Sequence, residues 1–238
     1  MPDRSYFYAP IEVEQGESFQ LGGKQYNHIV NVLRMAERDQ LDVVDGRGTL
    51  IRSTILSINN NHVECIAREV SSSANELPCR VALAVGMIKQ QRFEWMVEKA
   101  TELGVVKIQP LITDRVVRKG IRRDRLKKKA IAAMEQSERA VLPGIAELRP
   151  LDEYLEHVPV ENTIVAAQQL DNVSILDLLS QNTRESMNIL IGPEGGWSQR
   201  ELESFTRRKL RRVRLGQRRL RTETAAITAI SQVAAILE

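Results

Sequence analysis

The stretch NILIGPEGGWSQREL, residues 188–202, places three glycines, a proline and a carboxylate directly after an apolar run. The apolar run predicts a buried strand. Ser198 and Glu201 form the S-x-x-E pattern of a capping box, which predicts a helix that begins after Gly196. Glycines at the carboxyl end of a strand adopt positive φ angles and allow a ligand to approach the backbone closely. The stretch therefore predicts a ligand site, and the alternative is a tight turn that binds nothing.

A second strand, loop and helix occupy residues 211–237, and the loop carries three arginines before a helix that is apolar on nearly all sides. Such a helix must be buried against a sheet or against a second subunit. Thr222 or Thr224 could cap its first amides, and a bound ligand could satisfy the others. Arg221 and Glu223 stand beside the helix start, either as part of a site or as a local ion pair.

Two further polar groups interrupt predicted helices. The run EQSER, residues 135–139, lies in a helix whose other turns are apolar, so it either lines a site or interface or faces solvent. Lys99 and Glu102, near the end of another predicted helix, either belong to a site or form an exposed pair.

Several classes of site are disfavoured by missing patterns. The glycine loop is not G-x-G-x-x-G, and the chain contains no phosphate loop of the form G-x-x-x-x-G-K-[ST], so neither a standard dinucleotide site nor a nucleotide hydrolase is indicated. The sequence has no H-E-x-x-H and no C-x-x-C, and Cys65 and Cys79 sit among apolar neighbours. We therefore expect buried thiols, no disulfide framework and no metal.

Basic residues are concentrated in two blocks although the net charge is only +3. Nine of the fifteen residues at 115–129 and nine of the fifteen at 207–221 are lysine or arginine. Two such blocks create local positive fields that suit a polyanion such as a nucleic acid, whereas the alternative is a solvated helix face.

These candidate sites require two differently patterned parts to position them. Residues 1–72 are mostly short strands around one helix in NHIVNVLRM, with Asn27 as its cap, which predicts a small β-barrel. The serine-rich stretch 71–78 predicts a linker. Residues 73–238 alternate strands and helices, which predicts an α/β domain with a largely parallel sheet and ligands beyond its carboxyl edge.

The expected elements of the second part follow from apolar periodicity. We expect strands at 80–88, 105–113, 162–168, 187–192 and 211–216. We expect helices at 92–104, 122–141, 151–157, 174–181, 199–209 and 223–237. The chain has 238 residues, of which 42% are hydrophobic and 27% charged, as in ordinary folded proteins. No run reaches the roughly 18 apolar residues of a membrane helix, and no signal peptide is evident, so we expect a cytoplasmic protein.

Four motifs in order, EKATELGVVKIQPL, EQSERAVLPG, IGPEGGWSQRE and LGQRRLRTETA, resemble the RsmE family. The resemblance extends over nearly the whole chain, including HIVNVLRM. It implies a bacterial methyltransferase of the SPOUT superfamily that transfers a methyl group from S-adenosyl-L-methionine to N3 of one specific uridine in 16S ribosomal RNA of the small ribosomal subunit. It further implies a SPOUT-type sheet with a C-terminal trefoil knot at residues 73–238, a PUA-like barrel that binds RNA at residues 1–72, and a homodimer.

The resemblance, together with the chemistry of the implied reaction and the basic blocks, indicates candidate residues for three roles. Arg221 or Arg139 would stabilise the ionised base, and Glu223, Glu194 or Glu138 would remove its proton; we take Arg221, Glu223 and Arg139 as catalytic. The cofactor would contact Ala167, Gln168, Ile191, Gly192, Pro193, Glu194, Gly195, Gly196, Leu215, Gly216, Leu220, Thr222, Thr224 and Ala225. The RNA would contact His28, Arg34, Arg115, Arg118, Lys119, Arg122, Arg123, Lys127 and Lys128.

The chain departs from the family pattern at two loops. Thr113-Asp114-Arg115 stands where Glu-Arg-Ser is common, and Ala166-Ala167-Gln168-Gln169 stands where His-Pro is often found. Asp114 therefore receives no role from the resemblance. The competing hypothesis is an RNA-binding assembly factor without catalysis, which would use the same barrel and basic blocks but would have no need for two glycine-bearing loops at neighbouring strand ends.

Overall fold

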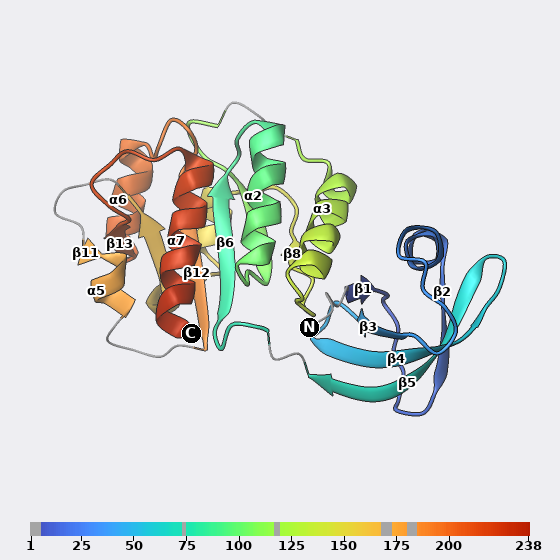
Figure 1. Cartoon of the computed structure of the whole chain (residues 1–238). Helices are drawn as coiled ribbons and strands as arrows, with labels where there is room; N and C mark the ends of the chain where they lie inside the picture. The colour runs from blue at the N-terminus through green and yellow to red at the C-terminus, as the bar shows by residue number, and fades with distance from the viewer. Residues whose placement is uncertain (1–5, 73–74, 117–119, 168–172, 180–184) are drawn as a thin grey trace. The chain divides into compact units, whose positions relative to one another are not determined.

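The computed structural model describes residues 6–72, 75–116, 120–167, 173–179 and 185–238. The chain divides into two compact units. The first comprises residues 1–76 and 131–142, and the second comprises residues 77–130 and 143–238. Figure 1 shows the strands of the first unit in blue to cyan and the elements of the second mainly in green to red.

The first unit contains a five-stranded sheet in the order β1-β3-β4-β5-β2. Strand β1 is parallel to β3, and the other neighbours are antiparallel. Alternate residues such as Phe7, Val43 and Ile55 share one buried core, as the period of a strand requires. The predicted strand-rich part is confirmed; because β1 and β2 end the order, a closed barrel stays a prediction. The strands are β1 (Tyr6–Tyr8), β2 (Ser18–Gly22), β3 (Gln40–Val44), β4 (Thr49–Ile58) and β5 (His62–Ser72).

The helix of this unit differs from the prediction. It begins as α1 (Gly23–Tyr26) and continues as a π-helix, η1 (Asn27–Val32), so Asn27 lies inside it and is not its cap. In a π-helix the backbone bonds reach one residue further than in an α-helix, as in the bond from Leu33 N to His28 O. Ile29 is therefore buried, whereas Val32 is 67% exposed and Leu33 is 41% exposed.

The second unit contains a sheet in the order β11-β13-β10-β12-β6-β7-β8, with β9 also paired to β7. Every pair in it is parallel, which confirms the predicted α/β fold. The strands are β6 (Arg80–Gly86), β7 (Lys107–Ile112), β8 (Gly144–Ile145), β9 (Arg149–Pro150), β10 (Thr163–Ala166), β11 (Val173–Ser174), β12 (Ser186–Ile191) and β13 (Arg211–Arg214).

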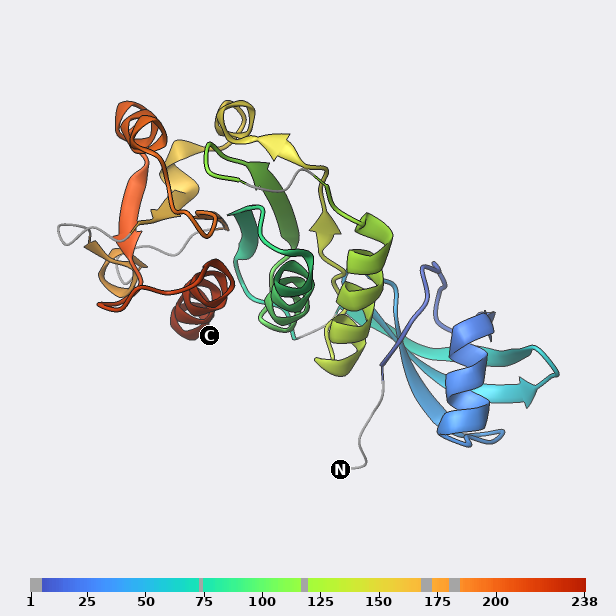
Figure 2. The ribbon, with the colours of Figure 1, turned by 90° about the horizontal axis from the view of Figure 1, so that it is seen from above.

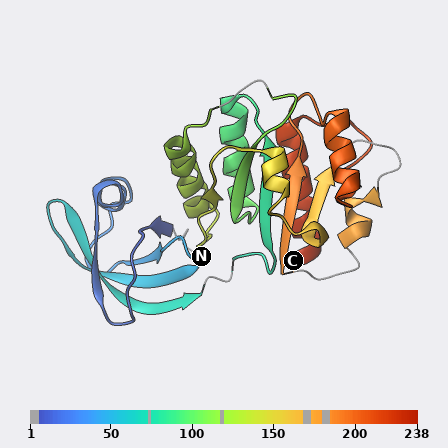
Figure 3. The same cartoon turned by 180° about the vertical axis from the view of Figure 1, so that it is seen from behind.

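Helices cover both faces of this sheet, which explains why its central strands are apolar without alternation. Figures 1 and 2 show α2 (Gln90–Glu102) and α7 (Thr222–Leu237) on one face. Figure 3, from behind, shows α4 (Leu151–Leu155) and α6 (Gln199–Arg207) on the other. Ala84 and Leu190 pack with these two helices. The remaining helical segments are α3 (Arg123–Gln136), α5 (Ile175–Leu179) and the short η2 (Val160–Asn162).

Helix α3 ends five residues before the predicted boundary at 141. Glu138 adopts a left-handed conformation with φ 55°, which leaves the helical path. The next amides, of Ala140 and Val141, donate to Glu76 Oε1 at 3.1 and 3.0 Å, and Glu76 Oε2 accepts from the Arg139 guanidinium. The Glu76 carboxylate therefore competes with continuation of the helix for the amides of these residues. Because Glu76 is 63 or more positions away in the sequence, helical periodicity does not reveal this contact.

Two other expectations concern single features of the chain. Cys65 and Cys79 are buried thiols, as predicted, and burial raises the pKa of the Cys65 thiol to about 12. Among the described residues, no helix has both the length and the apolar character needed to cross a membrane.

Candidate active site

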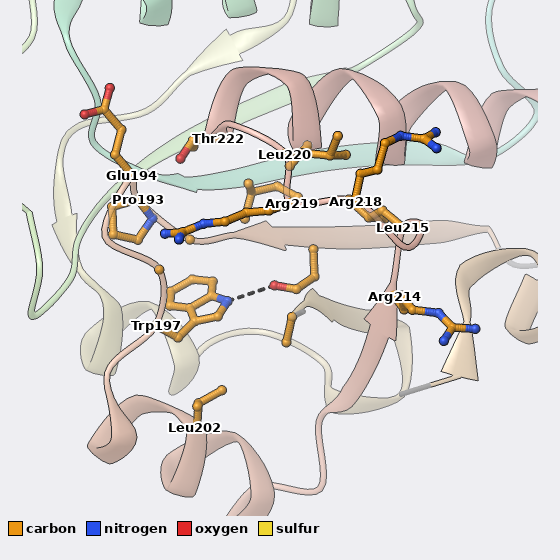
Figure 4. A pocket seen from close by; sticks show the side chains of 17 residues that line it. Pro193, Glu194, Trp197, Leu202, Arg214, Leu215, Arg218, Arg219, Leu220 and Thr222 are labelled. Carbon is orange, nitrogen blue, oxygen red and sulfur yellow. Dashed lines mark hydrogen bonds between the residues drawn. The ribbon is translucent and has the colours of Figure 1, made fainter. Parts of the chain in front are cut away.

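A cavity of about 290 Å³ lies at the carboxyl ends of β10, β12 and β13, which are neighbours in the sheet. The glycine loop, residues 192–197, forms one wall, and residues 214–220 with the first turn of α7 form another. Figure 4 shows Trp197 and Leu202 on one side of the space and Leu220 on the other. This is the edge of the sheet at which parallel strands present ligand sites.

Most of the predicted cofactor-binding residues line this cavity. Gln168 lies outside the described residues, and Thr224 and Gly195 are not part of the lining. Thr224 is exposed on α7, and the Gly195 carbonyl instead accepts a hydrogen bond from Arg115 Nη1 at 2.8 Å. The predicted residues that line the cavity are Ala167, Ile191, Gly192, Pro193, Glu194, Gly196, Leu215, Gly216, Leu220, Thr222 and Ala225.

Within the glycine loop, Gly192 is packed against the indole ring of Trp197, a residue that no pattern in the sequence singled out. A Cβ at Gly192 would lie 3.1 Å from Trp197 Cε2, so a larger residue there would displace the ring. Trp197 Nε1 donates to the Ala166 carbonyl at 2.9 Å, which connects the loop to the end of β10. The same ring contacts Phe205 edge-on, with centroids 5.0 Å apart. An aromatic residue directly after two glycines is the signal that could have identified it.

The predicted capping box of α6 is confirmed, and it also holds the loop after β7. Ser198 Oγ accepts from Glu201 N at 3.2 Å, and Glu201 Oε2 accepts from Ser198 N at 2.7 Å. The other oxygen, Glu201 Oε1, accepts from Asp114 N at 2.9 Å. Because Glu201 is fully buried and both its oxygens are bonded, it fixes the start of α6 against residues 113–115.

Asp114 joins the same assembly through its side chain. Its carboxylate accepts two hydrogen bonds from the Arg200 guanidinium, at 2.7 and 3.0 Å, and a third from Ser198 Oγ. These bonds lower the pKa of Asp114 to about 2. Arg200 also pairs with Asp152 at 2.7 Å. The loop that departs from the family pattern is therefore tied to α6 and, through Arg115, to the glycine loop.

The start of α7 differs from the prediction. Arg221 is the N-cap residue, and no side chain caps the helix, so neither Thr222 nor Thr224 plays that part. Arg221 is exposed, and Glu223 forms an ion pair with Arg92 of α2, at 3.6 Å. Glu223 is 8% exposed, and its Oε2 is buried without a hydrogen-bond partner in the described part of the chain. The sequence offered no signal for Arg92, because its contacts come from residues more than a hundred positions away.

Three arginines of the second basic block also line the cavity, namely Arg214, Arg218 and Arg219. In Figure 4 the Arg219 side chain extends toward Pro193, and those of Arg214 and Arg218 point away from it. A positive rim around an apolar cavity suits a site that also binds an anion at its entrance.

The third predicted catalytic residue, Arg139, belongs to the first unit and does not line the cavity. It is 2% exposed, and its Nη2 pairs with Glu76 Oε2 at 2.6 Å. These contacts give Arg139 a structural role, and its assignment as a catalytic residue stays a prediction. Lys99 forms the expected pair with Glu102, at 2.7 Å, which is the simpler of the two interpretations of these charges.

The predicted RNA-binding residues are at the surface wherever the structure describes them, Arg115 included. His28 and Arg34 are exposed in the first unit, and the His28 ring contacts Phe7 edge-on. Arg118 and Lys119 lie outside the described residues. The exposed members in the second unit are Arg115, Arg122, Arg123, Lys127 and Lys128. Exposed cations can bind phosphates, and their role in RNA binding stays a prediction.

Comparison with known proteins agrees with this architecture. Residues 75–234 match the family model described as an RNA methyltransferase domain, and residues 21–67 match that of an RNA methyltransferase PUA domain. The Bacillus subtilis protein named ribosomal RNA small subunit methyltransferase E is 30% identical over 93% of this chain and 91% of its own length. The protein of the same name from Synechocystis is 32% identical over 90% of this chain and 72% of its own.

Solved structures of methyltransferases also resemble this chain over nearly its whole length. The ribosomal RNA small subunit methyltransferase E of Neisseria gonorrhoeae, bound to S-adenosylmethionine, superposes with a TM-score of 0.89 at 26% identity, over 98% of each chain. A Legionella pneumophila structure in complex with the same cofactor superposes with a TM-score of 0.85 at 29% identity, again over 98% of each chain. With both family models matched in order, the chain belongs to the RsmE family of RNA methyltransferases.

Proposed function

We propose that the chain transfers a methyl group from S-adenosylmethionine to ribosomal RNA of the small subunit, and that the cavity between the glycine loop and α7 is the cofactor site. The observation that carries the proposal is the position of this cavity at three adjacent strand ends, in a chain whose relatives are named for this reaction. The Neisseria and Legionella structures, which contain S-adenosylmethionine, support the choice of cofactor.

The residues present fit that cofactor. The volume of the cavity, about 290 Å³, is near the lower end of the range for ligand pockets, about 300–1,000 Å³. Apolar side chains of Ile191, Leu202, Leu215 and Leu220 offer walls for a purine ring, and the glycine backbone leaves amides and carbonyls for its edge. When bound, S-adenosylmethionine supplies a methyl group on a positively charged sulfur.

We propose N3 of one specific uridine as the acceptor. In the neutral base this nitrogen carries a proton, so a group of the protein must accept the proton or stabilise the resulting anion. Glu223, with one carboxylate oxygen lacking a partner, is the candidate acceptor, and Arg221, exposed at the N-cap of α7, is the candidate cation. Glu194, which lines the cavity, is a second candidate acceptor.

The remaining proposals concern assembly and location. The family resemblance supports a SPOUT-type trefoil knot formed around the glycine loop and residues 215–224, and a homodimer with each site beside the partner chain. The match of residues 21–67 to a PUA domain supports residues 1–72 as the RNA-binding module. The basic block at 115–129 would add phosphate contacts. We place the chain in the cytoplasm, where ribosomal subunits are assembled.

One assay tests the function. Purified protein is incubated with labelled S-adenosylmethionine and small ribosomal subunits, and the modified nucleoside is identified by mass spectrometry. We expect 3-methyluridine; a different methylated nucleoside would refute the N3 assignment alone. Binding of the RNA without any methyl transfer would favour the assembly-factor hypothesis. Arg221→Ala should abolish transfer while the protein stays folded, and near-normal turnover would remove Arg221 from the mechanism.

A further inference from the structure

Arg92 of α2 connects two segments that come together at the candidate cofactor site. Its Nη1 lies 2.5 Å from Glu194 Oε1 in the glycine loop, and its Nε lies 3.6 Å from Glu223 Oε1 in the first turn of α7. Glu194 itself lines the cavity, and so does Thr222, the residue before Glu223. Arg92 is not part of the lining. It therefore contacts both walls of the cavity without entering it.

The two carboxylates depend on Arg92 to different degrees. The Glu194 side chain is 43% exposed, so water can replace the arginine there. The Glu223 side chain is only 11% exposed, and its second oxygen is buried without a partner in the described part of the chain. The start of α7 favours a negative charge, but this effect is modest compared with the cost of an unpaired buried carboxylate.

Loss of Arg92 should therefore move Glu223. An uncompensated buried charge relaxes toward solvent, because hydration is then its main source of stabilisation. Since Glu223 belongs to the first turn of α7, its movement displaces Thr222 from the cavity wall. The exposed carboxylate of Glu194 also loses the contact that fixes the side chain near α2.

We propose that Arg92 is a positioning residue of the cofactor site, which sets the separation between the glycine loop and the start of α7. The inference rests on the proposed function, because it takes the cavity to be the S-adenosylmethionine site. The effect of Arg92 is on affinity for the cofactor, since the ion pairs hold the walls between which the ligand binds.

The chain offers a matched control on the same helix. Lys99 also contacts two carboxylates, those of Glu98 at 3.1 Å and Glu102 at 2.7 Å, but all three residues belong to α2. Arg92→Met and Lys99→Met each remove one cation that bridges two acidic side chains. Only the first removes a connection between the glycine loop and α7.

The experiment measures S-adenosylmethionine binding to the purified full chain by calorimetry, together with the melting temperature of each variant. We expect Arg92→Met to weaken binding about tenfold, equivalent to about 1.4 kcal/mol, in a chain that remains folded at the temperature of the assay. Lys99→Met should bind as the unmodified chain does. Arg92→Lys should recover part of the affinity, because an ammonium group retains the charge but not the fork that reaches two carboxylates.

A double variant separates positioning from general damage. If Arg92 acts mainly by holding Glu223, Arg92→Met combined with Glu223→Gln should bind no more weakly than the worse single variant. Unchanged affinity in folded Arg92→Met would overturn the proposal. If Arg92→Met does not fold, an Arg92→Lys variant with full affinity would overturn it equally. Failure of the unmodified chain to bind S-adenosylmethionine would instead refute the proposed function.

Discussion

Replacing Trp197 with phenylalanine should loosen the wall of the cavity by a predictable amount. The change removes the hydrogen bond from Nε1 to the Ala166 carbonyl, at 2.9 Å, which contributes about 0.5–1.5 kcal/mol. It also removes part of a ring that is 8% exposed and packs edge-on against Phe205, a further loss of roughly 1 kcal/mol. The sum, about 2 kcal/mol, corresponds to a decrease in melting temperature of about 4–8 °C for a domain of this size.

The assay is thermal unfolding of Trp197→Phe beside Trp95→Phe, the same substitution at the other tryptophan of the chain. Trp95 is 44% exposed on α2, so its replacement should change stability by no more than about 0.5 kcal/mol. Because Trp197 lines the cavity, Trp95→Phe should also retain any fluorescence response to S-adenosylmethionine, and Trp197→Phe should lose it. Equal melting temperatures for the two variants, or a response that follows Trp95, would refute the reasoning.

The acid stability of the second unit should depend on Asp114, because its pKa is lowered from 3.8 to about 2; its ionised form stabilises the fold above pH 4, and this contribution disappears as the pH falls toward 2. Asp114→Asn should flatten the pH dependence of unfolding in that window, and an unchanged slope would contradict the assignment. Arg139→Met should destabilise the chain by about 3–5 kcal/mol in urea unfolding, since it leaves Glu76 without its buried partner, whereas Arg52→Met at an exposed pair should cost less than about 1 kcal/mol. Equal losses of unfolding free energy in the two variants would show that burial does not strengthen the contribution of the Arg139–Glu76 pair. Alanines at Lys127, Lys128 and Lys129 should weaken RNA binding and reduce its salt slope by about 2–3. An unchanged slope would make these lysines a solvated surface.

Local patterns predicted the parts of the fold that depend on local chemistry. The S-x-x-E motif at Ser198 identified the start of α6, and apolar runs identified β12, which leads into the glycine loop, and its parallel neighbour β6. The strand-end position of the two loops then gave the cavity and most of its lining. Each of these features is set by residues a few positions apart or by a regular period, which a single sequence contains.

The errors and omissions involve contacts between distant residues. Glu76 ends α3 early, Arg92 takes the place of Arg221 as the ion-pair partner of Glu223, and Trp197 bonds to the Ala166 carbonyl. The π-helix at Asn27 has a different cause, because its wider turn breaks the spacing that predicts which residues are buried. In each case the competing interaction depends on where other elements pack, which the sequence pattern does not specify.

The discontinuity of the first unit has a consequence for synthesis on the ribosome. Its five strands are complete by residue 72, yet the unit also includes residues 131–142, which are translated only after residues 77–130 of the other unit. Glu76 must wait for Arg139, Ala140 and Val141 before its carboxylate is satisfied. The N-terminal module therefore cannot finish folding as an independent first domain, and a fragment that stops at residue 76 should lack its final packing. During synthesis the first unit can therefore complete its folding only after part of the second has been translated. The segment that completes it, residues 131–142, lies in the sequence between the two parts of the second unit.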